Sequence, residues 1–315
     1  MHRVAIIVLS SLLSFSFFSL QSLAADSASR PQLQLTEIAT DVYVRAGVIE
    51  DIAPENGGRI ANLGFVVGED AIAVIDTGGS RVEGEALLAA IRLVSKKPIR
   101  YVINTHMHPD HVLGNAAFVA EAPVFVGHAK LPAAMQSHGD FYLKSFTRLI
   151  GEAAMEGTQI IAPTLLIYDT MKLQLGGREL ELQAWPAAHT DNDLTVIDRK
   201  SGTLFAGDLL FMRHLPVLDG SIKGWIAVMR DLPGLTANRV VPGHGPASAA
   251  WPAALAPQQA YFANLAKDLR QLLADGADVA EASAKAGQSA RNDWALFDRF
   301  NARNATAGYA ELEWE

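Results

Sequence analysis

Short apolar runs rich in β-branched residues open the chain after its N-terminal segment. They cover residues 42–44, 60–67 and 71–75, and glycine pairs stand at 57–58 and 78–79. Apolar runs of this length between glycine turns are typical of buried strands. Because the runs follow one another with short connections, the pattern predicts antiparallel strands joined by turns.

The apolar spacing changes to a helical period across residues 82–94, and a proline at 98 ends this predicted helix. Strands and helices then alternate along the chain. Further strands are predicted at 99–103, 124–126, 173–175, 180–185, 194–197, 203–206 and 239–241, and further helices at 113–118, 129–156 with breaks at Gly139 and Gly151, 222–232 and 252–273. This alternation predicts a layered α/β fold with both sheet faces covered, in one domain over residues 36–315.

The first 24 residues have the pattern of a secretory signal peptide. Arg3 precedes a run of 17 residues, of which 12 are apolar and five are serine, and Ser22-Leu23-Ala24 matches a small-x-small cleavage site. A membrane span needs about 20 mainly apolar residues, which this interrupted run does not reach. We therefore expect a signal peptide at 1–24, an extended arm at 25–35, no stable membrane anchor after cleavage, and export to the periplasm, with an extracellular destination as the alternative.

Composition restricts both partners and chemistry. The 315 residues hold 26 Lys and Arg against 34 Asp and Glu, a formal net charge of −8, and half of them are apolar. An acidic chain offers no basic surface for a nucleic-acid backbone, so we expect no nucleic acid as a partner. The chain has no cysteine, which excludes disulfides, thiolate ligands and a cysteine nucleophile.

A dense group of imidazoles follows the strand predicted at 99–103. Residues 105–111 read Thr-His-Met-His-Pro-Asp-His, although the whole chain has only nine histidines. Side chains two positions apart on extended backbone point the same way, so His106 and His108 can bind one ion. Asp110 and His111 then turn toward a second ion. The spacing predicts two neighbouring metal sites.

Three more candidate ligands, His189, Asp208 and His244, each follow an apolar run and stand beside a turn residue. The series H-x-H-x-D-H, a lone His, G-D and G-H-G resembles the motifs of the metallo-β-lactamase-fold metallohydrolases across essentially the whole mature chain. This resemblance implies a mixed α/β fold, the four-layer αβ/βα sandwich, with a dinuclear metal site along one edge of its two sheets.

The resemblance also implies a role for each motif residue. The first metal would be held by His106, His108 and His189, the second by Asp110, His111 and His244, and Asp208 would bridge them. This donor set suits two Zn²⁺ ions and also suits Fe or Mn, and export favours zinc. We therefore expect a metal-bridging hydroxide to attack a small-molecule ester, thioester, lactone or lactam at its carbonyl carbon. Asp110 is the expected catalytic residue, because it would both bind the second metal and orient the nucleophile.

Departures from the family pattern narrow the resemblance. The absence of cysteine excludes the major lactamase group that has a cysteine ligand, and Asp208 after a glycine resembles the glyoxalase II type. Segments 108–118, 189–196 and 216–225 resemble the exported zinc metallohydrolases associated with quinoprotein-relay and sulfur-oxidation systems. The alternatives are a β-lactamase-like or glyoxalase II-like activity, an iron-dependent oxygenase acting on a sulfur compound, and a noncatalytic metal-binding partner in a periplasmic redox pathway.

Several other residues near the motifs have two interpretations. Asp76 ends a strand, where it either hydrogen-bonds a ligand imidazole or caps a turn. The loop at 50–59 is either a flap over the site or an ordinary hairpin loop. Asp219 and Trp225 are candidates for a substrate wall, with core packing the alternative for Trp225. Three histidines are expected to lie outside the ligand set: His128, which a capping position explains, His138 and His214.

Overall fold

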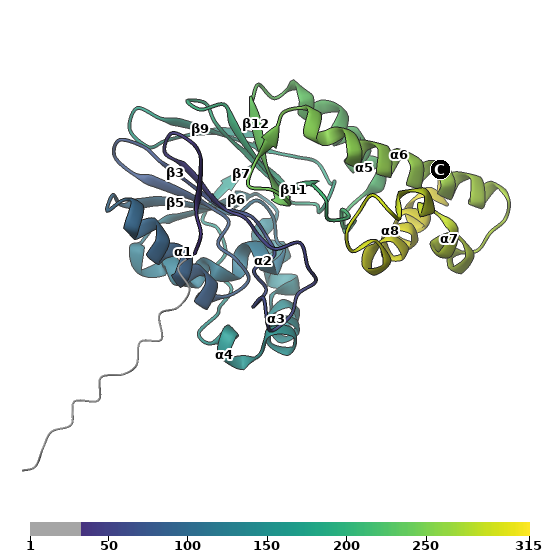
Figure 1. Cartoon of the computed structure of the whole chain (residues 1–315), viewed down its shortest axis with the longest axis horizontal. Helices are drawn as coiled ribbons and strands as arrows, with labels where there is room; N and C mark the ends of the chain where they lie inside the picture. The colour runs from purple at the N-terminus through teal and green to yellow at the C-terminus, as the bar shows by residue number, and fades with distance from the viewer. Residues whose placement is uncertain (1–32) are drawn as a thin grey trace, which may run out of the picture. The chain divides into compact units, whose positions relative to one another are not determined.

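Two mixed β-sheets face each other in the computed structural model, which describes residues 33–315 (Figure 1). In the first sheet, seven strands of the described residues lie side by side in sequence order. They are β1 (Thr36–Ala39), β2 (Val42–Arg45), β3 (Leu63–Val67), β4 (Ile72–Ile75), β5 (Ile99–Ile103), β6 (Val124–His128) and β7 (Leu165–Ile167). Strands β1 to β4 pair antiparallel and β4 to β7 pair in parallel. The antiparallel pairing of β2, β3 and β4 is as the sequence predicts, whereas β1 and β7 were not predicted.

The second sheet has the strand order β13-β12-β11-β10-β9-β8. Its strands are β8 (Thr170–Gln174), β9 (Glu179–Ala184), β10 (Leu194–Asp198), β11 (Thr203–Phe211), β12 (Arg239–His244) and β13 (Ala249–Ala250). Neighbouring strands are antiparallel except for β11 and β12, which are parallel. The parallel pair matters for the site, because both of its strands end at the same edge of the sheet.

Helices cover the outer face of each sheet. Figure 1 shows α1 and α3 on one side of the paired sheets and α5, α6 and α8 on the other. The α-helices are α1 (Arg81–Val94), α2 (Pro109–Val112), α3 (Leu131–Ile150), α4 (Glu152–Met155), α5 (Ile222–Asp231), α6 (Ala256–Ala274), α7 (Val279–Lys285) and α8 (Phe297–Leu312). Short 3₁₀ helices are η1 (Leu113–Glu121), η2 (Leu232–Gly234), η3 (Ala253–Leu255) and η4 (Gln288–Ala290).

Apolar side chains fill the three interfaces between these layers. Val66 and Phe205 pack in the interface between the two sheets. Leu87 of α1 packs against the outer face of the first sheet, and Trp225 of α5 and Phe262 of α6 pack against the second. The structure therefore confirms the mixed α/β class and the four-layer αβ/βα sandwich.

The sequence prediction of the helices was wrong in two places. Helix α3 runs through Gly139, where a break was expected. A Cβ at Gly139 would lie 2.8 Å from Ile160 Cγ1, so this glycine permits close packing and does not end the helix. The last predicted helix, at 252–273, begins only at Ala256, and two unpredicted helices, α7 and α8, follow it.

The N-terminal predictions fall mostly on residues that are not described. The signal peptide predicted at 1–24 lies outside the described residues, as does most of the arm predicted at 25–35. Residues 33–35 carry no helix or strand. Between residues 33 and 315, no helix combines the length and the apolar content that crossing a membrane requires.

A buried ion pair connects β2 to the start of α1. Arg45 of β2 pairs with Glu83 in the first turn of α1, and both side chains are buried. Glu83 Oε2 also accepts a hydrogen bond from Gly79 N at 2.7 Å, and Ser80 Oγ caps the helix by accepting one from Glu83 N at 3.2 Å. Arg45 Nη1 donates to the carbonyl oxygen of Arg59 at 3.2 Å. Burial lowers the pKa of Arg45 to about 9.

Candidate metal centre

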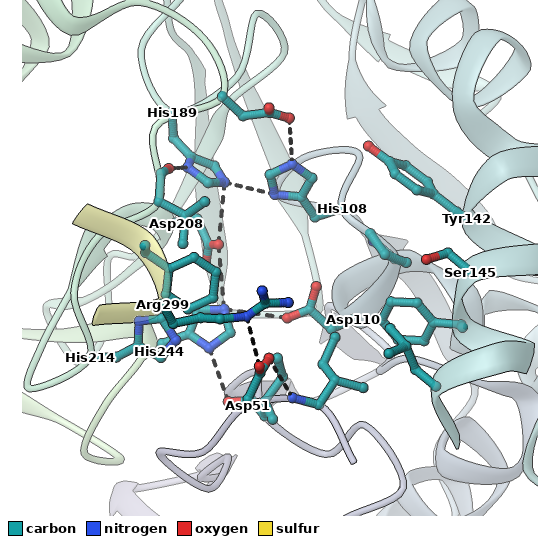
Figure 2. Close-up of a pocket in the computed structure, with 18 of the residues that line it drawn as sticks. Asp51, His108, Asp110, Tyr142, Ser145, His189, Asp208, His214, His244 and Arg299 are labelled. Atoms are coloured by element: carbon teal, nitrogen blue, oxygen red, sulfur yellow. Dashed lines mark hydrogen bonds and ion pairs between the residues drawn. The ribbon is translucent and has the colours of Figure 1, made fainter. Parts of the chain in front are cut away.

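The seven predicted ligands lie where strands of both sheets end. His106 and His108 follow β5, Asp110 and His111 belong to α2, His189 follows β9, Asp208 lies in β11, and His244 ends β12. Asp208 and His244 meet because β11 and β12 are parallel neighbours, and Phe211 of β11 pairs in register with His244. Residues up to 138 positions apart are thus brought to one place. Figure 2 shows five of them, His108, Asp110, His189, Asp208 and His244.

The donor atoms form two groups, and within each group they lie within 4.8 Å of one another. The groups are His106, His108, His189 and Asp208, and Asp110, His111 and His244. Asp208 also reaches the second group, because its Oδ1 lies 3.2 Å from His111 Nε2 and its Oδ2 lies 3.4 Å from His244 Nε2. This is the place expected of a bridging carboxylate. That these seven side chains hold metal ions remains a prediction.

Each of the five imidazoles is held by a hydrogen bond on its outer nitrogen, which leaves the other nitrogen facing the group. The pairs are His106 Nδ1 with Thr105 Oγ1 (3.0 Å), His108 Nε2 with Asp219 Oδ2 (3.0 Å), His111 Nδ1 with Asp76 Oδ2 (2.8 Å), His189 Nδ1 with Val217 O (2.7 Å) and His244 Nδ1 with Ile60 O (3.1 Å). Metal-binding histidines in proteins are usually oriented in this way.

Three buried polar atoms in this cluster have no hydrogen-bond partner among the described residues: His106 Nε2, His111 Nε2 and Asp208 Oδ1. Buried polar atoms normally have a partner, so this arrangement calls for one. Imidazole nitrogens and carboxylate oxygens that converge on one point fit a divalent cation. The donor set therefore indicates a divalent metal.

The carboxylates of the cluster make the local potential negative. Burial opposes a positive charge on His244, but Asp208 and Asp110 outweigh it and raise the pKa of His244 to about 9. The same balance of burial against Asp208, Asp110 and Asp76 raises the pKa of His111 well above its ordinary value. Carboxylates that favour a positive charge on His111 and His244 also favour a bound cation there, whereas burial lowers the pKa of His106 well below its ordinary value.

Two glycines make room for Asp208. Gly207 has a φ of 52°, in the left-handed region, and a Cβ there would lie 2.7 Å from Thr105 Cβ. A Cβ at Gly243 would lie 1.8 Å from Asp208 Oδ1. The glycines of the G-D and G-H-G motifs therefore allow the carboxylate to approach the imidazoles of both groups.

Asp76 supports the second ligand group by a hydrogen bond to the outer nitrogen of His111. Its Oδ2 lies 2.8 Å from His111 Nδ1 and 2.7 Å from Thr105 Oγ1, and its Oδ1 accepts from Thr105 N at 2.8 Å. Its φ of 57° lies in the left-handed region, which aspartate and asparagine tolerate better than most residues. Of the two interpretations offered by the sequence, the structure favours the hydrogen bond to a ligand imidazole.

We expect Asp76→Asn to weaken binding of the metal at the second group by about 10- to 100-fold, the usual cost of losing such a partner of a ligand. Asparagine keeps the size and the backbone preference, but it offers one acceptor oxygen where the carboxylate offers two. Competition with a chromophoric chelator measures the affinity. Asp140→Asn, which removes an exposed carboxylate, is the matched control. Equal affinities in the two variants would show that Asp76 does not support the ligand.

The other histidines singled out in the sequence, and Trp225, lie outside the two ligand groups. His128 ends β6 and its Nδ1 accepts from Lys130 N at 3.0 Å, a structural contact before α3. The N-cap of α3 is Lys130, so the predicted capping role of His128 was wrong. His138 and His214 line a cavity beside the ligands but belong to neither ligand group. Trp225 is fully buried in the core, and its ring centroid lies 5.2 Å from that of His189.

This cavity, of about 400 Å³, opens over the ligands. On one side α3 contributes an apolar and aromatic wall of Phe141, Tyr142, Phe146 and Leu149. Figure 2 shows Tyr142 and Ser145 of α3 across the cavity from His108 and His189. Asp51 and Ile52 of the 50–59 loop and Asp219 also line the cavity, so this loop takes part in the site.

Helix α8 also contributes to this cavity, although no sequence pattern predicted it. Arg299, Phe300 and Arg303 of α8 line it together with the ligands. Arg299 pairs with Asp51 and Arg303 pairs with Asp219, each at 2.8 Å. No motif pointed to these arginines, because the helix that carries them was not predicted.

Comparison with known proteins gives the family of the chain. The model of the metallo-beta-lactamase superfamily matches residues 56–244. The chain belongs to the metallo-beta-lactamase superfamily. All seven predicted ligands lie within the matched segment, and α8 lies outside it. Zinc is the divalent metal typical of this family, in agreement with the donor set.

Relatives within this superfamily include sulfatases. The chain is 25% identical over 211 residues to a linear primary-alkylsulfatase from Pseudomonas sp., a match that covers 56% of this chain and 40% of the relative. It is 27% identical over 166 residues to the uncharacterized protein YobT from Bacillus subtilis, covering 51% of this chain and 67% of that protein. The chain thus spans less than half of the alkylsulfatase.

Solved structures show the same fold. A metallo-beta-lactamase from Pontibacter korlensis superposes with a TM-score of 0.61 at 21% identity and covers 74% of this chain and 100% of its own. The inverting sec-alkylsulfatase Pisa1 from Pseudomonas sp. superposes with a TM-score of 0.66 at 18% identity, over 88% of this chain and 50% of its own. Superfamily members similar to this chain, alkylsulfatases and beta-lactamases among them, are hydrolases.

Proposed function

We propose that this chain is a metal-dependent hydrolase that uses two divalent ions, with zinc as the favoured metal. One observation carries the proposal: Asp208 lies between two groups of ligands, with its oxygens 3.2 to 3.6 Å from imidazole nitrogens of both. When bound, two such ions would lower the pKa of a shared water and polarise the bond to be cleaved.

The protein side chains supply orientation and proton transfer. Asp110 lines the cavity, and its Oδ2 lies 3.3 Å from His244 Nε2. From this position Asp110 Oδ2 can accept a hydrogen bond from the attacking water and orient it toward the substrate. Asp110 is therefore the residue to which we assign the catalytic role. The apolar wall of α3 would exclude bulk water from the reacting group.

The favoured substrate is a small molecule with a carbonyl-type bond, such as an ester, thioester, lactone or lactam. A sulfate ester with an alkyl chain is the second candidate, and two observations favour it. The wall of Phe141, Tyr142, Phe146 and Leu149 is suited to an apolar chain, and the chain is similar in sequence to a linear primary-alkylsulfatase. Hydrolysis of either class uses the same nucleophile.

The test combines metal content with a substrate panel. Elemental mass spectrometry of the purified protein should find two equivalents of zinc. Acyl esters, thioesters, lactones, β-lactams and alkyl sulfates of matched chain length are then compared, with Asp110→Asn as the variant expected to lose hydrolysis. Fully loaded protein that hydrolyses none of them contradicts the proposal and favours a noncatalytic metal-binding partner. One equivalent of iron with O₂ consumption favours an oxygenase.

We also propose that the chain is exported to the periplasm after cleavage behind Ala24. The support is the pattern of residues 1–24 and the resemblance of segments 108–118, 189–196 and 216–225 to exported zinc metallohydrolases. A partner in a periplasmic redox pathway follows from that resemblance. Intact mass of the protein from a periplasmic extract should correspond to a chain that begins at Ala25. A mass that includes Met1 contradicts export.

A further inference from the structure

Helix α8 lies outside the segment 56–244 that matches the superfamily, yet it lines the cavity over the ligands. Two of its lining residues are arginines one turn apart, Arg299 and Arg303. Arg299 Nε donates to Asp51 Oδ2 at 2.8 Å, as Figure 2 shows, and Asp51 is not a predicted ligand. Arg303 instead pairs with Asp219, which contacts the predicted ligand His108.

A single carboxylate links Arg303 to a ligand imidazole. Arg303 Nη2 donates to Asp219 Oδ1 at 2.8 Å, and Asp219 Oδ2 lies 3.0 Å from His108 Nε2. Asp219 is the acceptor in both contacts, so His108 carries its proton on Nε2. The lone pair of His108 Nδ1 then faces the ligand group, 2.8 Å from His189 Nε2.

The next residue of α8 holds the loop that supports a second ligand. The Asn304 side chain accepts from Leu218 N at 2.9 Å and donates to the carbonyl oxygen of Pro216 at 2.7 Å. Val217 lies between these two contacts, and its carbonyl oxygen accepts from His189 Nδ1 at 2.7 Å. Arg303 thus acts on His108 through Asp219, and Asn304 acts on His189 through the backbone of residues 216–218. Two adjacent residues of α8 therefore support two imidazoles of the same ligand group.

We propose that α8 is part of the metal centre and that Arg303 is a positioning residue for His108, an inference that rests on the proposed two-metal site. The guanidinium group restricts rotation of the Asp219 carboxylate, and the carboxylate sets the ring orientation and the tautomer of His108. The role is specific to the first ligand group, because His111 and His244 donate their outer hydrogen bonds to Asp76 Oδ2 and to the carbonyl oxygen of Ile60.

Arg303→Gln should weaken binding of one of the two metal equivalents by about tenfold and leave the other unchanged. This is the low end of the usual range for residues behind a ligand, because Arg303 acts through Asp219. The Arg303 side chain is 53% exposed, so the variant should fold. Arg303→Lys should restore most of the affinity, since Arg303 makes one N–H contact to Asp219 and not a two-fold one. Titration against a chelator measures both equivalents.

Arg299→Gln is the matched control, because it removes the same charge from the same face of α8 without touching Asp219. Long-range ¹H–¹⁵N spectra of the histidine side chains provide a second readout. The parent protein should show His108 protonated on Nε2, and Arg303→Gln should show a mixture of tautomers. Arg303→Gln with the affinity and the His108 tautomer of Arg299→Gln would overturn the inference. A parent protein that binds no divalent metal contradicts the proposed function, and the tautomer of His108 then decides the positioning role alone.

Discussion

Replacing Asp208 with asparagine should abolish binding of both metal equivalents. The oxygens of Asp208 lie within 3.6 Å of imidazole nitrogens from both ligand groups. The amide removes the negative charge and turns one acceptor into a donor that faces other ligands. Bound metal ions contribute several kcal/mol of transition-state stabilisation in enzymes of this kind. If about 4 kcal/mol of this is lost, kcat/KM should fall by about 10³-fold.

Elemental mass spectrometry and kcat/KM on the substrate identified by the panel are the measurements for Asp208→Asn. Asp191→Asn is the control, because Asp191 lies two residues from His189 but its side chain is 54% exposed and pairs with Lys130. The control should keep two equivalents of metal and the parent activity. Two equivalents of metal in Asp208→Asn would refute the bridging role.

Arg45→Met should lower the free energy of unfolding by about 3 to 5 kcal/mol, because it leaves the Glu83 carboxylate buried without its cation. Arg45 and Glu83 are only 4% exposed. Glu83 also accepts from Gly79 N, so a change at this carboxylate reaches the loop that follows Asp76. Denaturant unfolding at fixed metal concentration measures the loss.

Two further variants separate burial from charge in this experiment. Arg270→Met breaks a pair with Glu315 that has two close contacts, 2.7 and 2.9 Å, but lies at the surface, and it should have little effect. The double variant Arg45→Met, Glu83→Gln should regain most of the stability, since no buried charge is left unpaired. The expectation fails if Arg45→Met and Arg270→Met unfold at the same midpoint.

The central strands β3, β4, β10 and β11 could be predicted from the sequence because they are buried along their whole length, and buried strands are continuous apolar runs. The short, partly exposed strands β1, β7 and β13 lack runs of that length and were not predicted. Helix α8 could not be predicted either, although its buried positions follow a helical period. Those positions are Phe297, Asn301, Asn304, Ala305, Gly308 and Leu312. Two are asparagines, and Asn304 donates to the Pro216 carbonyl oxygen and to Tyr261 Oη. A helix that packs through hydrogen bonds and small residues has no apolar stripe for a sequence pattern to detect.

The candidate site was likewise predictable only in part. The seven motif residues could be identified because imidazoles and carboxylates grouped at strand ends are typical of metal ligands. Most of their supports could not, because they are far away in the sequence or belong to the backbone; Thr105, next to His106, is the exception in position. His108 and Asp219 are 111 positions apart, and His189 and His244 are oriented by carbonyl oxygens, which any residue provides. For Asp76 the sequence allows both interpretations, and the 2.8 Å distance to His111 decides between them.

Each ligand group draws donors from both sheets of the sandwich. His106 and His108 follow a strand of the first sheet and meet His189 and Asp208 from the second, and in the other group Asp110 and His111 meet His244. Neither half of the chain contains a complete group. Bound ions would therefore cross-link the two sheets, and their free energy of binding would add to the cohesion of the interface between them. The midpoint of denaturant unfolding should then rise with the concentration of free metal.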